Sequence, residues 1–153
     1  SNLPGLRSGF VAGDADLLTP FKRYRTYHGC AMSLPLQHAS IAAWQDEAHV
    51  QDNREAYREK FAAVTAELAP VMDFPTPEAS FYLWPAVPDG DDIAFTQRLY
   101  EDMHVSVLPG SLMGRPGPDG VNPGSGRLRL ALVADVGSTR EAAERIRRLV
   151  ERG

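Results

Sequence analysis

The sequence is poor in lysine, cysteine and uninterrupted apolar segments, and each shortage narrows what the chain can do. A single cysteine among 153 residues cannot form an internal disulfide, which favours a reducing cytosol. No apolar run approaches the roughly 20 residues that span a bilayer and no signal peptide is visible, so we expect no membrane partner. The formal net charge is −4, without a basic patch interleaved with aromatic residues, which argues against nucleic acid as a partner.

Several patterns of known active sites are also missing. There is no Gly-x-Gly-x-x-Gly segment and no nucleophile elbow. The histidines show no metal-ligand spacing, so we expect no metal site: His28, His38, His49 and His104. We interpret Asp91 and Asp92 as a helix cap rather than a catalytic pair, and Cys30 as a small buried hydrophobe rather than a reactive thiol. A content of 43% hydrophobic and 24% charged residues is typical of a globular domain with a core.

In the first half of the chain the apolar pattern predicts one strand followed by helices. The glycine-bounded run 9–13 predicts a buried strand. Asp14 then suits a helix cap, although Pro20 suggests that the helix begins at or after this proline. A long helical region is predicted from Gln37 to about Met72, with an interruption near 46–50. Its apolar stripe predicts a core-facing surface: Tyr57, Phe61, Val64, Leu68 and Val71.

The second half predicts a mixture of strands and helices around a glycine-rich and proline-rich loop. We expect strands over 80–85, covered on both faces, over 105–108 and over 126–133, with a functional loop over 111–126. Asp91 or Asp92 should cap a helix whose one side carries Ile93, Thr96, Leu99, Tyr100 and Met103. A capping box at 138–141 should open the last helix, whose apolar positions are Ala143, Ile146, Leu149 and Val150. This order favours a small antiparallel sheet packed by helices, an α+β arrangement.

Two arginines stand out as anion ligands. Arg7 lies on a turn punctuated by proline and glycine, and a guanidinium offers a planar, always charged donor pair to a phosphate monoester. Arg127 and Arg129 project to one face of their predicted strand, and the leucines between and beside them to the other. A guanidinium also suits a substrate carboxylate. The alternatives are a surface arginine beside a turn for Arg7 and a solvated edge-strand residue for Arg129.

These segments resemble the fold-type-I, or class I and II, aminotransferases that use pyridoxal 5'-phosphate. The segment 1–14 resembles the stretch after the family's cofactor lysine, and 105–111 resembles its Val-x-Val-x-Pro-Gly-Ser segment. The segment 79–84 matches its Gly-Ser-Phe-Tyr-Leu-Trp strand, with Ala79 where glycine is frequent. The resemblance implies an α/β parent fold. Residues 1–46 would end its large cofactor-binding domain, and 47–153 would form the α+β small domain with a linking helix over 50–72.

The resemblance also implies roles for individual residues. Arg7 would bind the cofactor phosphate and Arg129, in Arg-Leu-Ala-Leu, the substrate carboxylate, whereas Arg127 would be structural or lie at the pocket rim. The family's Ser-x-Ser-Lys lysine stands eight residues before the phosphate arginine, which places it upstream of Ser1. The aspartate that pairs with the cofactor's pyridine nitrogen is upstream as well. Lys22 and Lys60 stand in other contexts. We therefore expect the chain to be the C-terminal part of a longer protein, with no catalytic residue of its own.

A narrower resemblance concerns the N-succinyldiaminopimelate aminotransferases, which serve the synthesis of diaminopimelate and lysine. It rests on four segments: 25–29, 39–44, 53–61 and 120–127. It implies amino-acid and 2-oxo-acid substrates, with 2-oxoglutarate as acceptor, a cytoplasmic homodimer, and Arg115 as a candidate contact of the distal substrate group. Two alternatives stay open. The parent could be another fold-type-I enzyme, such as a different transaminase or a C–S lyase, or the chain could be a non-catalytic interaction module in which both arginines are incidental.

Overall fold

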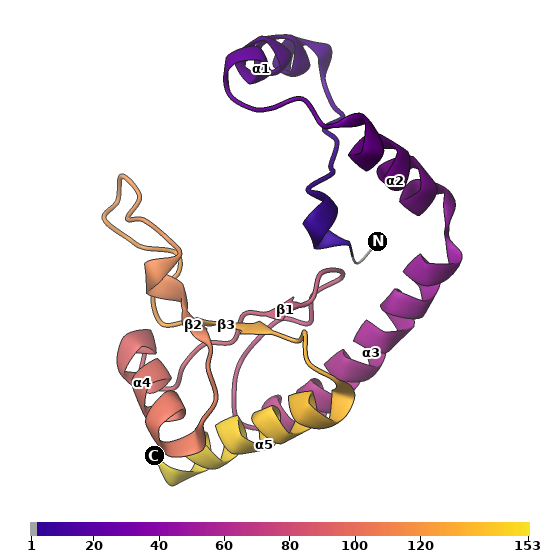
Figure 1. Ribbon diagram of the computed structural model, residues 1–153. Coiled ribbons are helices and arrows are strands. Elements are labelled where there is room, and N and C mark those ends of the chain that lie inside the picture. The colour runs from indigo at the N-terminus through magenta and orange to yellow at the C-terminus, as the bar shows by residue number, and fades with distance from the viewer. Residues whose placement is uncertain (1–2) are drawn as a thin grey trace. The chain divides into compact units, whose positions relative to one another are not determined.

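The computed structural model describes residues 3–153 (Figure 1). Ser1 and Asn2, the first residues of the opening motif, lie outside the described residues. The chain divides into two compact units, Ser1–Arg54 and Glu55–Gly153. Among residues 3–153 no helix combines the length and the apolar character that crossing a bilayer requires.

The first unit is helical. It contains a 3-10 turn η1 (Pro4–Leu6), helix α1 (Ala15–Tyr27), helix α2 (Leu34–Gln45) and the start of α3 (Ala48–Leu68). The Oδ1 atom of Asp14 accepts a hydrogen bond from the N–H of Asp16 at 2.7 Å, which confirms the predicted cap. Pro20 lies inside α1, so the prediction of a later start was wrong. Proline's fixed φ is compatible with a helix, but at this position its missing N–H leaves the carbonyl of Asp16 without its helical donor.

Two other predictions for this unit were wrong. Residues 7–14 carry no regular structure, and Phe10 is 72% exposed, although a buried strand was predicted over 9–13. A strand needs a neighbour that accepts its backbone hydrogen bonds, and no strand in residues 3–153 pairs with this segment. Cys30 is exposed between α1 and α2 instead of buried.

The helical region that leads into the second unit is interrupted as predicted. Helix α2 ends at Gln45, and the Oδ1 atom of Asp46 accepts a hydrogen bond from the N–H of Ala48 at 3.1 Å, where α3 begins. Helix α3 ends at Leu68 rather than near residue 72, because Pro70 cannot donate a backbone hydrogen bond and disfavours helical backbone at the residue before it. The domain boundary between residues 46 and 47 stays a prediction.

The second unit is built on a small antiparallel sheet, as predicted. Strand β3 (Leu128–Ala131) lies between β1 (Tyr82–Leu83) and β2 (Leu108–Pro109). The register pairs Tyr82 with Ala131 and Leu108 with Arg129. The strands are shorter than predicted, and prolines at 85 and 109 contribute to this because they cannot donate to a ladder. Pairing nevertheless continues beyond β1, where the N–H of Leu128 donates to the carbonyl of Pro85 at 3.0 Å.

Helices α3, α4 (Asp92–Met103) and α5 (Val136–Arg152) contribute to one core with the sheet. The buried side chains of the core are Val64, Leu68, Met72, Leu83, Val87, Phe95, Leu99, Met103, Leu128, Leu130, Leu132, Ala143, Ile146 and Leu149. The predicted stripe of α3 is confirmed for Val64 and Leu68, with Phe61 and Val71 partly buried against the core, and Tyr57 is not part of it. The predicted face of α5 is confirmed. In α4 the prediction was partly wrong: Phe95 is buried and Tyr100 is 63% exposed, because the helix packs through residues 95, 99 and 103.

The start of α5 also differs from the prediction. Asp135 is the N-cap: its Oδ1 accepts the N–H of Ser138 at 2.9 Å and its Oδ2 accepts the Ser138 hydroxyl at 2.6 Å. Ser138, predicted as the cap, therefore lies inside the first turn. Because Asp135 accepts the N–H of Ser138 in the first turn, the helix extends back to Val136.

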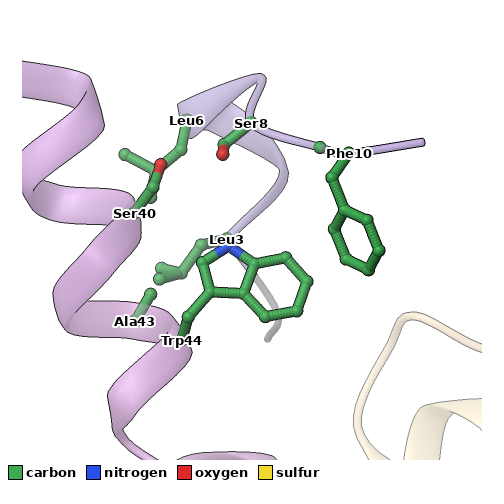
Figure 2. A pocket seen from close by; sticks show the side chains of 8 residues that line it. Leu3, Leu6, Ser8, Phe10, Ser40, Ala43 and Trp44 are labelled. Carbon is green, nitrogen blue, oxygen red and sulfur yellow. The ribbon is translucent and has the colours of Figure 1, made fainter. Parts of the chain in front are cut away.

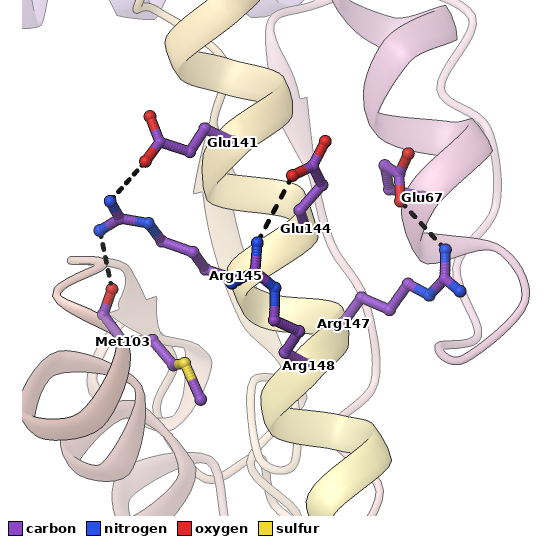
Figure 3. Close-up of polar contacts among 7 residues, drawn as sticks. All are labelled: Glu67, Met103, Glu141, Glu144, Arg145, Arg147 and Arg148. Atoms are coloured by element: carbon purple, nitrogen blue, oxygen red, sulfur yellow. Dashed lines mark hydrogen bonds and ion pairs between the residues drawn. The ribbon is translucent and has the colours of Figure 1, made fainter.

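Polar side chains of α5 reach both neighbouring helices (Figure 3). Arg147 pairs with Glu67 of α3 at 3.2 Å, and Arg145 donates to the carbonyl of Met103 at the end of α4 at 3.1 Å. Hydrogen bonds from Arg147 to Glu151 and to Glu67 raise the pKa of this guanidinium. Exposed ion pairs stabilise little, so we assign these contacts mainly to the orientation of α5.

Candidate functional site

Arg7 lies where the 3-10 turn η1 ends. Its φ of 51° and ψ of 28° are left-handed, and its N–H donates to the carbonyl of Pro4 at 3.2 Å. Left-handed backbone is uncommon for a residue other than glycine and costs free energy, so it often marks a position with a function. The residue is exposed. The segment thus presents an exposed cation on a tight turn.

The surroundings of Arg7 fit an anion. Among residues 3–153 no carboxylate forms an ion pair with its guanidinium. A guanidinium without a carboxylate partner retains its paired donors for a phosphate. The phosphate monoester of pyridoxal phosphate has the matching charge and acceptor geometry. Arg7 therefore fits one arm of a cofactor phosphate site.

A separate pocket of about 360 Å³ lies between residues 3–10, which include η1, and helix α2 (Figure 2). Leu3, Leu6 and the Trp44 indole are among its apolar lining, and Ser8 and Ser40 supply two hydroxyl groups. Phe10 contacts Trp44 edge to face, with the ring centroids 5.2 Å apart. No charged side chain lines this pocket, so it does not form the anion site of Arg7.

Arg129 lies on the central strand β3, and the structure shows what holds it. Leu128 and Leu130 on either side are buried, whereas Arg129 is half-buried on the opposite face. Its guanidinium carbon lies 4.1 Å from the ring centroid of Tyr82, and its Nη2 donates to the Tyr82 hydroxyl at 2.5 Å. Stacking on an aromatic ring restrains a guanidinium and leaves its remaining donors available.

Tyr82 was not among the residues predicted for the site. It is directly opposite Ala131 in the β1–β3 register, which makes Arg129 its diagonal neighbour two residues along β3. Diagonal pairs in antiparallel strands are within reach of long and aromatic side chains. The segment 80–85 carried the signal, because its alternation places Tyr82 on one face, but only the register identifies its partner.

The contacts of Arg127 indicate a different role from that of Arg129, although both residues lie on the same face. Its Nη1 donates to the carbonyl of Trp84 at 3.1 Å, and its backbone carbonyl accepts the N–H of Gly110 at 2.7 Å. These contacts join three segments of the second unit. Arg127 is therefore structural, in agreement with one of the two roles expected for it.

The side chain of Asp92 accepts hydrogen bonds from both ends of the loop over 111–126. Asp92 is 4% exposed; its Oδ2 accepts the N–H of Ser111 at 2.7 Å and its Oδ1 accepts the N–H of Gly126 at 3.3 Å. Burial by itself raises the pKa of Asp92, but these N–H donors outweigh it and hold the pKa below its ordinary value. Asp91 is the helix cap, since it accepts the N–H of Ala94 at 2.9 Å.

The remaining sequence candidates carry no comparable site. Arg115 is exposed in the loop, and Lys22 is exposed on α1. Lys60 lies 4.7 Å from the ring centroid of Tyr57 and donates to the carbonyl of Val133 at 3.4 Å. Within the described part of the chain, histidine, cysteine and carboxylate side chains form no cluster of three that could hold a metal ion. Arg7 and Arg129 belong to different units, so their meeting at one ligand stays a prediction.

The fold and motifs define a class of protein. The family model "Aminotransferase class I and II" matches residues 1–146, so the chain belongs to this family, whose members depend on pyridoxal phosphate. It is 30% identical to the LL-diaminopimelate aminotransferase of Syntrophobacter fumaroxidans over 151 residues, which are 97% of this chain and 37% of that protein. The family predicted from the motifs is confirmed.

Solved structures that resemble this chain are also described as aminotransferases. An aminotransferase from Neisseria meningitidis shares 58% identity with a TM-score of 0.84, over 97% of this chain and 38% of that one. A probable N-succinyldiaminopimelate aminotransferase from Thermus thermophilus shares 31% identity with a TM-score of 0.79, over 96% of this chain and 38% of that one. The predicted fold class is confirmed. The chain spans about 37% of the length of the LL-diaminopimelate aminotransferase that it matches.

Proposed function

We propose that the chain is the C-terminal part of an aminotransferase that moves an amino group from an amino acid to a 2-oxo acid. The observation that carries this proposal is the arrangement of Arg129, whose guanidinium is stacked on Tyr82 on a central strand and keeps donors for a carboxylate. Amino acids and 2-oxo acids share a carboxylate beside the reacting carbon. A fixed guanidinium can therefore bind the donor and the acceptor in turn and orient each of them.

In this proposal Arg7 holds the cofactor and Arg129 holds the substrate. Pyridoxal phosphate, when bound, supplies the electron sink for the substrate's carbanion. Arg7 would bind the phosphate and so fix the cofactor's position, whereas Arg129 would bind the α-carboxylate. Both roles require the two guanidinium groups to meet at one ligand in the complete enzyme. Residues 1–46 would then end the large domain and 47–153 would form the small domain of a cytoplasmic homodimer.

For the substrate we propose N-succinyl-diaminopimelate, with 2-oxoglutarate as acceptor, in diaminopimelate and lysine biosynthesis. The segments 25–29, 39–44, 53–61 and 120–127 support this choice, as does the similarity to a structure described as a probable N-succinyldiaminopimelate aminotransferase. Arg115 is the only cation of the loop over 111–126. We assign to it the distal carboxylate of the donor. Replacing it with glutamine would raise KM for donors that carry a distal carboxylate and would leave KM for alanine unchanged.

The test uses the complete gene product that contains this chain, loaded with pyridoxal phosphate. Glutamate formation from 2-oxoglutarate is measured with N-succinyl-LL-diaminopimelate, LL-diaminopimelate, aspartate and alanine as donors. We expect the highest kcat/KM with the succinylated donor. A preference for another donor overturns the substrate assignment and leaves the aminotransferase. Release of pyruvate from cystathionine without glutamate formation supports a C–S lyase, and failure to bind the cofactor at all supports an interaction module.

The 153-residue chain by itself should not transaminate, because its lysines, Lys22 and Lys60, stand outside the cofactor motif. Purified chain is mixed with pyridoxal phosphate, a donor and 2-oxoglutarate, and glutamate formation is followed. A sample prepared from a host that lacks the corresponding aminotransferase is the control for contamination. Turnover in that sample refutes the assignment of the catalytic lysine to another part of the protein.

A further inference from the structure

The buried carboxylate of Asp92 does more than cap a helix. Asp92 is the first residue of α4, yet the preceding Asp91 already caps that helix. The two oxygens of Asp92 accept instead from Ser111, 19 residues away, and from Gly126, 34 residues away. One side chain thus binds both ends of the loop over 111–126. No helix-capping role requires these contacts.

The negative charge of Asp92 requires hydrogen-bond donors at this buried position. A carboxylate that is 4% exposed has lost most of its hydration, so its charge must be compensated by donors within the protein. The N–H groups of Ser111 and Gly126 provide such compensation, together with the positive N-terminal end of α4. An asparagine of the same shape would present an amide N–H₂ to one of these donors. The loop would then lose an anchor at one end, and the remaining hydrogen bond would be weaker.

The rest of the loop base is tight. A Cβ at Gly110 would lie 2.3 Å from the carbonyl oxygen of Gly124, so the two backbone segments are in close contact. The Asn122 side chain donates to the carbonyl of Ser111 at 2.8 Å and accepts the N–H of Gly124 at 3.0 Å. These contacts close the loop on itself. Asp92 attaches the closed loop to α4.

Asp92 also holds the segment that leads into β3, the strand on which Arg129 lies. Gly126 is held by Asp92, its carbonyl accepts the N–H of Val87 at 2.9 Å, and the chain continues into β3, where Arg129 lies three residues later. Gly126 is thus joined to Arg129 by two residues only, and both of them are held by backbone hydrogen bonds to neighbouring segments. The loop and the start of β3 depend on the same carboxylate.

We propose that Asp92 is a positioning residue for the substrate, because it holds both ends of the loop over 111–126 and fixes Gly126, which precedes Arg129 by three residues on the segment that leads into β3. This inference rests on the proposed function, in which Arg129 binds the substrate carboxylate. Asp92 acts through the loop and the strand and does not touch the substrate.

The experiment compares three variants of the complete enzyme loaded with pyridoxal phosphate. Asp92→Asn removes the charge of the anchor. Asn122→Ala loosens the loop without touching Asp92 or α4. Asp91→Asn is the matched control, because asparagine caps a helix as well as aspartate does. Amide hydrogen exchange at Ser111 and Gly126 reports the loop directly, and steady-state kinetics with the best donor report binding and turnover separately.

In Asp92→Asn we expect the amides of Ser111 and Gly126 to exchange at least about 10-fold faster than in the wild type. We also expect KM to rise by about 10-fold, while kcat stays within about 3-fold of the wild type. A 10-fold factor in either quantity corresponds to about 1.4 kcal/mol. Asn122→Ala should change both quantities in the same direction, and Asp91→Asn should change neither. A purely structural role would lower the amount of folded enzyme without raising KM of the folded fraction, so the separation of KM from kcat distinguishes the two.

Two results overturn the inference: wild-type protection of both loop amides in Asp92→Asn, or faster exchange with an unchanged KM. If Asp92→Asn does not fold, Asn122→Ala decides in the same way, because an unchanged KM in a loosened loop contradicts a positioning role. Failure of the proposed function is recognised separately, because the wild type would then turn over no amino donor at all.

Discussion

Two arginines on the same face of β3 allow a sharp test of the carboxylate site. Arg129→Lys and Arg127→Lys keep the charge and change only the geometry of the donors. Arg129 is stacked on Tyr82 and has donors left for a ligand, whereas Arg127 donates to the carbonyl of Trp84. The first substitution should therefore weaken substrate binding and the second should not.

The magnitude follows from what lysine cannot reproduce. An ammonium group is a point charge, so Arg129→Lys loses the bidentate geometry toward a carboxylate and the planar stacking on Tyr82. A hydrogen bond to a charged group contributes about 1.5–3 kcal/mol, which corresponds to a KM increase of roughly 10-fold to 150-fold. Arg127→Lys keeps a charged donor for the Trp84 carbonyl, so this hydrogen bond can be retained and only the geometry of the donor changes.

The assay is glutamate formation by the complete enzyme over a range of donor concentrations at saturating 2-oxoglutarate, repeated with the acceptor varied. Because the same guanidinium would serve donor and acceptor, Arg129→Lys should raise KM for both. Arg127→Lys should leave both KM values within about 3-fold of the wild type and lower only the midpoint of urea unfolding. Equal KM effects of the two substitutions, or none for Arg129→Lys, would refute the assignment of the carboxylate to Arg129.

Three further outcomes are expected. Arg7→Ala should weaken pyridoxal phosphate binding by about 10-fold or more, since one charge-assisted phosphate contact is lost; titration of the apoenzyme with cofactor measures this, and a titration with pyridoxal, which has no phosphate, should show no difference. The pKa of Asp92 lies below its ordinary value of 3.8, so its contribution to stability is complete above that pH and is lost as the pH falls through the lower folded-state pKa. Protection of the loop amides, corrected for intrinsic exchange, should thus be constant between about pH 5 and 8 and fall only in stronger acid; a loss near pH 6 would contradict the assignment. Leu99→Ala should destabilise the folded enzyme by about 3–5 kcal/mol in urea unfolding, because Leu99 is 0% exposed, whereas Tyr100→Ala at a 63% exposed position should change it little.

Family motifs and helical periodicity were the features that could be predicted from the sequence. The stripe of α3 and the buried face of α5 follow from apolar spacing, which needs no information beyond neighbouring residues. The antiparallel sheet and the opposite facing of Arg129 and the adjacent leucines follow from strand alternation. Residue spacing was sufficient to predict these faces, because the face on which a side chain lies depends only on its position within its own helix or strand.

Predictions failed where a choice depended on distant partners. Several residues of α4 could have been buried, and only packing against the sheet and α5 selected Phe95 over Tyr100. The segment 9–13 is apolar enough for a strand, yet it has no strand beside it within residues 3–153. In each case the sequence pattern allowed more than one arrangement.

The sequence by itself determined the family, the positions of Arg7 and Arg129 within their motifs, and the helical faces with clear periodicity, because all of these are properties of consecutive residues. Only the tertiary structure decided which side chains complete the site. Tyr82 meets Arg129 across 47 residues, and Asp92 meets Gly126 across 34. Contacts of this range arise from strand register and helix packing, which bring together residues that no spacing rule connects.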